Sequence, residues 1–218
     1  MATTVSMTNI LANNGKGWFP AQRGNCTWQL SSITPGDGAA SSIKIIPSGA
    51  GEVTLTSAAH ALVASHKYYV TFKIRFEAAV TGTCDWYWPV AEPAAAAGMA
   101  VNAAAGAWTR LSAVFDRVRF ANGSYNCRFD YNNNDGGNKV FWFTSCLLID
   151  LTAAFGAGLE PSKEWLDKHI TAFSDSPSVD YIDNLDELFA GISSAIQTKS
   201  GQPGKIFACD FIDKILAL

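Results

Sequence analysis

A short aromatic segment, Asp85-Trp86-Tyr87-Trp88-Pro89, contains the residue types that bind sugars. Trp and Tyr rings can stack on the C–H faces of a sugar while a polar edge still forms hydrogen bonds. In a strand, Trp86 and Trp88 point to one side and Tyr87 to the other, so the three rings cannot share a face. The segment therefore fits either a glycan platform or packing inside the protein, because Trp is usually mostly buried.

A second polar set alternates along a predicted strand, with Arg128, Asp130 and Asn132 on one face and aromatic residues on the other. Arg, Asp and Asn supply donors and acceptors that suit sugar hydroxyls. The alternative is a solvated face with an Arg–Asp pair of small energetic value. The candidate carbohydrate-binding residues are Trp86, Tyr87, Trp88, Arg128, Asp130 and Asn132.

Oxygen ligands near the end of this strand also suit Ca²⁺ in type; they are Asp130, Asn132, Asn134 and Asp135. Their spacing does not match an EF-hand loop, because Gly136 comes one place late and Phe141 stands where a bidentate Glu is needed. A tight turn is the preferred interpretation, so we expect no metal and no other cofactor.

Catalytic motifs are missing from the sequence, which has no G-x-S-x-G, no H-E-x-x-H and no phosphate-binding glycine loop. A glycosidase needs only two well-placed carboxylates. The acidic residues Glu52, Glu77, Asp85, Glu92, Asp116 and Asp130 therefore leave a glycan depolymerase open as a third alternative. We expect the protein not to be an enzyme.

The composition limits the class of protein. Of the 218 residues, 48% are hydrophobic and 16% are charged, which is typical of a globular protein with a large core. The net charge of −3 and the lack of a Lys/Arg cluster argue against nucleic-acid binding. We expect no signal peptide and no membrane insertion, and hence synthesis in a cytoplasm. The five cysteines include no C-x-x-C pair, which indicates buried reduced thiols.

The elements that would position these side chains are short strands. Alternating patterns predict strands at 53–56, 67–76, 108–115, 125–131 and 139–143, and Asn132–Gly137 has the composition of a hairpin turn between the last two. The segment 67–76 places Tyr68, Val70, Phe72, Ile74 and Phe76 on one face. We interpret Ala91–Ala107 as a long connection. The pattern indicates an antiparallel sandwich or barrel.

The segment Leu147–Ile170 begins with an apolar strand and continues through turn glycines at 156 and 158 into a helix. Glu160 is expected at the helix cap and Pro161 at the first helical position. The sequence of Leu148–Trp165, LIDLTAAFGAGLEPSKEW, resembles a signature of structural proteins from bacteriophages that infect Gram-positive bacteria. The resemblance implies an antiparallel jelly-roll β-sandwich similar to carbohydrate-binding modules.

Helical spacing returns near the C-terminus, after a linker predicted at 174–182. A helical hairpin is expected at 183–218, with an apolar face formed by Leu188, Phe189, Ile192, Ile196, Phe211 and Ile215. The stretch LFAGISSAIQTKSGQPGKIFACDFIDKI resembles a motif that ends many phage tail and baseplate proteins. That resemblance implies an assembly role, because a tail this small must dock on another surface to be stable.

Together the two resemblances imply a non-enzymatic virion protein with a mainly β domain at 1–173 and the helical tail. The expected partners are other virion proteins, sister copies in a homo-oligomer and host cell-wall glycan. A tail fibre or baseplate component that binds carbohydrate is the first expectation. A purely structural decoration, collar or head-fibre protein is the alternative.

Overall fold

The computed structural model describes residues 3–11, 22–49, 51–88, 97–116, 121–133, 138–171, 173 and 177–181. The chain divides into two compact units, one of Ser6–Val179 and the other of Met1–Val5 with Asp180–Leu218. Within these described ranges, no helix is both long enough and apolar enough to cross a membrane. The predicted tail residues Leu188, Phe189, Ile192, Ile196, Phe211 and Ile215 lie outside the described residues.

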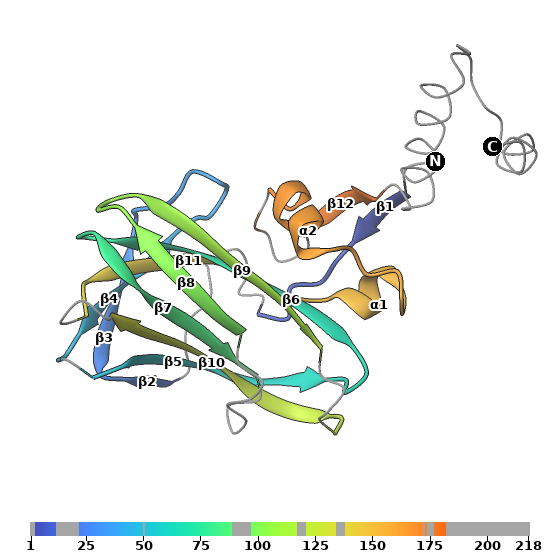
Figure 1. Ribbon diagram of the computed structural model, residues 1–218, viewed down its shortest axis with the longest axis horizontal. Coiled ribbons are helices and arrows are strands. Elements are labelled where there is room, and N and C mark those ends of the chain that lie inside the picture. Colours follow the sequence, from blue (N-terminus) through green and yellow to red (C-terminus); the bar gives the residue numbers. More distant parts are fainter. Residues whose placement is uncertain are drawn as a thin grey trace, which may run out of the picture. The chain divides into compact units, whose positions relative to one another are not determined.

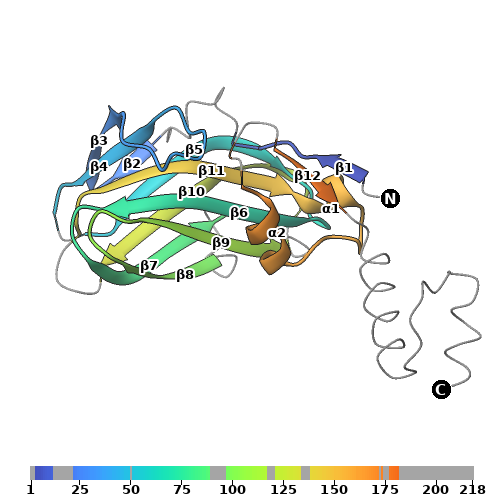
Figure 2. The same ribbon diagram turned by 90° about the horizontal axis from the view of Figure 1, so that it is seen from above.

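The larger unit contains two five-stranded antiparallel sheets (Figure 1). The first sheet has the order β2-β5-β10-β7-β8 and consists of Gln22–Gly24, Val53–Leu62, Gly123–Asn133, Val80–Tyr87 and Ala97–Ala103. The second has the order β3-β4-β11-β6-β9 and consists of Cys26–Ser31, Ser42–Pro47, Phe141–Asp150, Lys67–Phe76 and Trp108–Asp116. Figure 2 shows the same layers from above.

The strand order is that of a jelly roll. From β4 to β11 the chain places β4, β6, β9 and β11 in one sheet, in the order β4-β11-β6-β9, and β5, β7, β8 and β10 in the other, in the order β5-β10-β7-β8. This is the eight-stranded, double Greek-key arrangement, with β2 and β3 added at two edges. The predicted mainly β, jelly-roll sandwich is therefore confirmed.

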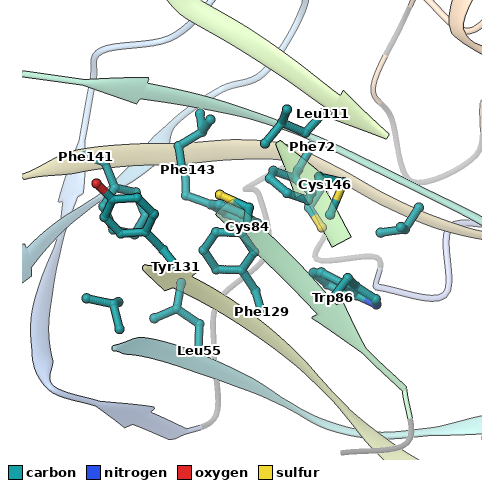
Figure 3. Packing of buried hydrophobic residues seen from close by; sticks show 14 of the residues in the cluster. Leu55, Phe72, Cys84, Trp86, Leu111, Phe129, Tyr131, Phe141, Phe143 and Cys146 are labelled. Carbon is teal, nitrogen blue, oxygen red and sulfur yellow. The ribbon is translucent and has the colours of Figure 1, made fainter. Parts of the chain in front are cut away.

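The core lies between the sheets and is rich in aromatic rings (Figure 3). Phe72 is at its centre, with ring centroids 5.0 Å from Phe143 and 5.1 Å from Phe129. The predicted inward face of β6 is confirmed, because all five of its residues have no exposed surface: Tyr68, Val70, Phe72, Ile74 and Phe76. Four cysteines are buried thiols, as predicted: Cys26, Cys84, Cys127 and Cys146.

Two predicted connections differ from the structure. Strands β10 and β11 do not form a hairpin, because β10 pairs with β5 and β7 whereas β11 pairs with β4 and β6. The turn composition indicated a chain reversal but could not show that the chain crosses to the other sheet. The interpretation of Ala91–Ala107 as a connection is also wrong in part, because Ala97–Ala103 forms edge strand β8 beside β7.

Three polar residues of the 148–165 segment, Asp150, Glu160 and Ser162, form hydrogen bonds that cap helices or fix a turn. Asp150 caps helix α1 (Leu151–Phe155) by accepting from the Ala153 amide at 2.9 Å. Helix α2 (Lys163–His169) is capped by Ser162, not by Glu160 as expected. Glu160 instead accepts from the Thr152 hydroxyl at 2.6 Å and the Gly158 amide at 2.9 Å, which fixes the glycine turn.

Helix α2 packs on the outer side of the second sheet through Arg110. The guanidinium donates to the Asp167 carbonyl at 2.8 Å and the Ile170 carbonyl at 3.0 Å. It also donates to the Tyr69 hydroxyl at 2.6 Å, and Tyr69 in turn donates to the Asp167 carboxylate at 2.7 Å. Arg110 was not singled out from the sequence, because its partners are distant along the chain.

Near the chain ends, β1 (Thr3–Ser6) and β12 (Ser178–Tyr181) form a two-stranded sheet. Ser178–Tyr181 falls within the expected linker, so part of that stretch is a strand. The turn-like residues just before it did not indicate a strand because their composition is that of a loop.

Candidate functional site

The aromatic segment at the end of β7 divides between the inside and the outside of the sandwich. Trp86 and Trp88 have no exposed surface. Trp88 packs edge-on against Tyr68 with 4.8 Å between ring centroids, and its Nε1 donates to the Tyr125 carbonyl at 3.1 Å. Trp86 points into the core beside Phe72 (Figure 3). Their interpretation as a glycan platform is therefore wrong, because rings closed in by both sheets cannot stack on a sugar.

Tyr87 lies on the outer face of the first sheet, as the alternation of the strand predicts. It pairs across the strands with Arg128, whose guanidinium carbon is 4.8 Å from the centroid of the Tyr87 ring. A cation over an aromatic face is attracted by the ring quadrupole. Two of the predicted residues are thus brought together on an outward-facing surface.

Asp130 lies two residues beyond Arg128 on the same face. Its Oδ2 accepts from Arg128 Nη2 at 2.6 Å, and its side chain is 1% exposed. Burial raises the pKa of Asp130 to about 6, although Arg128 acts to lower it. Oδ1 of Asp130 is buried and has no hydrogen-bond partner among the described residues. Asp130 Oδ1 is therefore an acceptor without a described partner, next to the Arg128 guanidinium that Oδ2 binds.

A second carboxylate, Asp85, stands directly opposite Asp130 on β7. Burial raises the pKa of Asp85 as well, and Glu52 and Asp85 both act to raise the pKa of Asp130. The sequence alone does not indicate that Asp85 faces Asp130, because this pairing depends on the strand register. On the other side of β10, Thr54 and Thr56 pair with Asp130 and Arg128.

We call this set the β7–β10 face; its residues are Thr54, Thr56, Asp85, Tyr87, Arg128 and Asp130. It offers an aromatic ring, a guanidinium, two carboxylates and two hydroxyls on neighbouring strands. Asn132 continues the row on β10 opposite Thr83, but its side chain lies outside the described residues.

Two of the four candidate calcium ligands, Asn134 and Asp135, lie outside the described residues. In the part of the chain that the structure describes, no group of three or more His, Cys, Asp or Glu side chains is placed to hold a metal ion. Asp130 itself is paired with Arg128, which occupies one of its oxygens.

Comparisons with known proteins give structural likenesses only. No family model matches the chain, and no curated protein matches it. An α-L-arabinofuranosidase structure is 13% identical over 67% of this chain and 26% of that chain, with a TM-score of 0.49. A carbohydrate-binding module from Cellvibrio mixtus lichenase 5A, in complex with cellotriose, is 15% identical over 69% of this chain and 98% of that module, with a TM-score of 0.40.

A domain of bacteriophage CBA120 tailspike protein 4 is also similar, at 11% identity over 64% of this chain and 21% of that chain, with a TM-score of 0.44. The chain thus spans about a quarter of the arabinofuranosidase and about a fifth of the tailspike structure.

Proposed function

We propose that this protein is a non-enzymatic component of a bacteriophage virion, in a tail fibre or baseplate, that binds host-surface carbohydrate through the β7–β10 face. The observation that carries the proposal is the outward-facing Tyr87 ring with Arg128 held across it and Asp130 beneath. The chain would be made in the bacterial cytoplasm and act in the virion.

The chemistry of the face suits sugar hydroxyls. A hydroxyl both donates and accepts, so its recognition needs acceptors and donors whose positions are fixed before binding. Arg128 is fixed by Asp130 and Tyr87, and the partly exposed Asp85, opposite Asp130, is an acceptor on the same face. Tyr87 adds a ring that can pack on sugar C–H groups.

The virion assignment is supported by the two sequence resemblances, one at Leu148–Trp165 and one in the C-terminal stretch. Under this proposal the tail at 183–218 attaches the protein to other virion proteins or to sister copies. The second candidate, a purely structural decoration, collar or head-fibre protein, is favoured by the burial of Trp86 and Trp88 in the core.

The test is binding of the purified full chain to cell walls of a susceptible host and to an array of bacterial glycans. We expect saturable binding that Tyr87→Ala weakens about tenfold or more and that Tyr87→Phe largely retains. The matched control is Asn102→Ala, an exposed polar residue on β8 of the same sheet.

The other outcomes separate the alternatives. No binding by the folded wild-type chain would overturn the glycan proposal in favour of the structural role. Release of reducing ends from the glycan, abolished by Asp85→Asn, would instead identify a depolymerase, because paired carboxylates are what glycoside hydrolysis requires.

A further inference from the structure

A second surface lies on the outer face of the other sheet, where one residue from each strand forms a continuous row. Strand pairing places Gln29 beside Lys44, Lys44 beside Trp142, Trp142 beside Arg75, and Arg75 beside Trp108. At about 4.8 Å between strands, the row is roughly 19 Å long. We call it the Trp142 row; Figure 1 shows the order of its strands, β3-β4-β11-β6-β9.

The centre of the row is an indole between two cations. Trp142 is 8% exposed, and its Nε1 donates to the Ser31 hydroxyl at 3.1 Å. Lys44 Nζ lies 5.4 Å and Arg75 Cζ lies 4.7 Å from the Trp142 ring centroid. Trp142 thereby holds both cations at fixed places on the sheet surface.

Arg75 is held particularly firmly. Its Nε donates to the Gly106 carbonyl at 2.8 Å while its guanidinium lies over Trp142. The Nε side of the guanidinium is therefore already bonded. Because the group is held in place, it loses less rotational freedom on binding an anion than a mobile Arg side chain would.

Neither cation is neutralised by the described part of the protein. The described Lys and Arg residues that form ion pairs with carboxylates are Lys67, Lys73, Arg110, Arg128 and Lys163. No described carboxylate lies within ion-pair distance of Lys44 or Arg75. Glu77, which directly follows β6, accepts from the Val140 amide at 3.3 Å. Two cations that no described carboxylate pairs with make this row favourable for binding anions.

The Trp108 ring beside Arg75 indicates which class of anion the row suits. Trp108, next to Arg75 in the row, is partly exposed, unlike Trp142. A Trp face packs on a sugar ring, and an Arg fork binds a carboxylate through two parallel hydrogen bonds. A sugar acid presents both groups on one ring. From the Trp142 row we infer a binding site for a linear uronic-acid polysaccharide, with a sugar on Trp108, its carboxylate on Arg75 and a further carboxylate at Lys44.

This site does not rest on the proposed function, because it uses the opposite sheet and a ligand of defined charge. The test is affinity electrophoresis of the full chain in gels containing polygalacturonate, neutral galactan or polyphosphate. We expect retardation by polygalacturonate alone, weakened about tenfold by Arg75→Gln and by Lys44→Gln. Trp108→Ala should weaken it and Trp108→Tyr should retain it.

The matched control is Lys168→Gln, which removes one exposed positive charge from α2. Urea unfolding of each variant shows whether it is folded. If Arg75→Gln does not fold, Lys44→Gln provides the test of the charged row. Absence of retardation by polygalacturonate, equal retardation by polyphosphate, or an equal effect of Lys168→Gln would overturn the inference. Tyr87→Ala should leave this binding unchanged, which separates its failure from failure of the β7–β10 face.

Discussion

Trp86 and Tyr87 are neighbours in the sequence, yet Trp86 is closed inside the sandwich while Tyr87 packs against Arg128 on the outside. Replacing Trp86 with Ala and replacing Tyr87 with Ala should therefore change the stability of the fold by different amounts. We expect Trp86→Ala to lower the free energy of unfolding by about 3–5 kcal/mol, because it leaves a cavity beside Phe72. Tyr87→Ala should cost about 1 kcal/mol or less. Urea unfolding of both variants measures this, and equal losses would contradict the assigned orientation.

Arg110 joins α2 to the second sheet, so its loss should affect that helix first. Arg110→Met keeps much of the apolar stem but removes the donors to the Asp167 and Ile170 carbonyls and to Tyr69. We expect a loss of about 1–3 kcal/mol in the free energy of unfolding, because partly buried acceptors lose their donors.

Hydrogen exchange of the α2 amides should also rise in Arg110→Met, which a general loss of stability would not confine to one helix. Lys168→Met is the control, since Lys168 is exposed on α2 and should change stability by less than about 0.5 kcal/mol. Unchanged exchange in α2 would show that other contacts hold the helix.

Ser162 and Glu160 offer a direct comparison of a helix cap with a turn residue. Ser162 Oγ accepts from the Trp165 amide at 3.2 Å, so Ser162→Ala should cost about 1 kcal/mol. Ser162→Gly should cost only a few tenths of that amount. Chemical unfolding measures both, and an equal cost for the two substitutions would argue against a capping role.

The sequence predicted best where apolar residues on the inward face of a strand alternate with mostly polar residues on the other face. The alternation in β6 marked all five of its inward residues, and the same rule separated Trp86 from Tyr87. It failed where a strand is covered on both sides, as in β11, whose residues from Phe141 to Ile149 are all buried. There burial does not alternate, because outward residues are covered as well: Trp142, for example, lies under Lys44 and Arg75.

The candidate site could be predicted only in part, because it depends on register between strands that are distant in the chain. The alternation placed Arg128 and Asp130 on one face, but nothing local to them indicates Asp85 or Tyr87 as their neighbours. The Trp142 row was missed for the same reason: its five members come from five strands and each is unremarkable alone.

Asp130 should make stability depend on pH with the opposite sign to an ordinary ion-paired acid. Burial raises its pKa to about 6 from the usual 3.8, against the lowering effect of Arg128. Between these pH values the folded state binds more protons than the unfolded state, so the stabilisation by Asp130 is complete below about pH 4 and is lost as the pH rises through about 6. The total change is about 3 kcal/mol.

Asp130→Asn removes this titration, so the free energy of unfolding of the variant relative to wild type should rise by about that amount between pH 4 and pH 7. Asp167→Asn provides the contrast. Burial would raise the pKa of Asp167, but hydrogen bonds from Lys163, Ser112 and Tyr69 outweigh burial and lower it. Its stabilisation is present above about pH 4 and is lost as the pH falls further, so the deficit of Asp167→Asn should shrink in acid. Urea unfolding at half-unit steps from pH 2.5 to 7.5 measures both profiles. A pH-independent difference for Asp130→Asn would show that the pKa of Asp130 is the same in the folded and unfolded states, and a profile like that of Asp167→Asn would show that Arg128 keeps the carboxylate ionised.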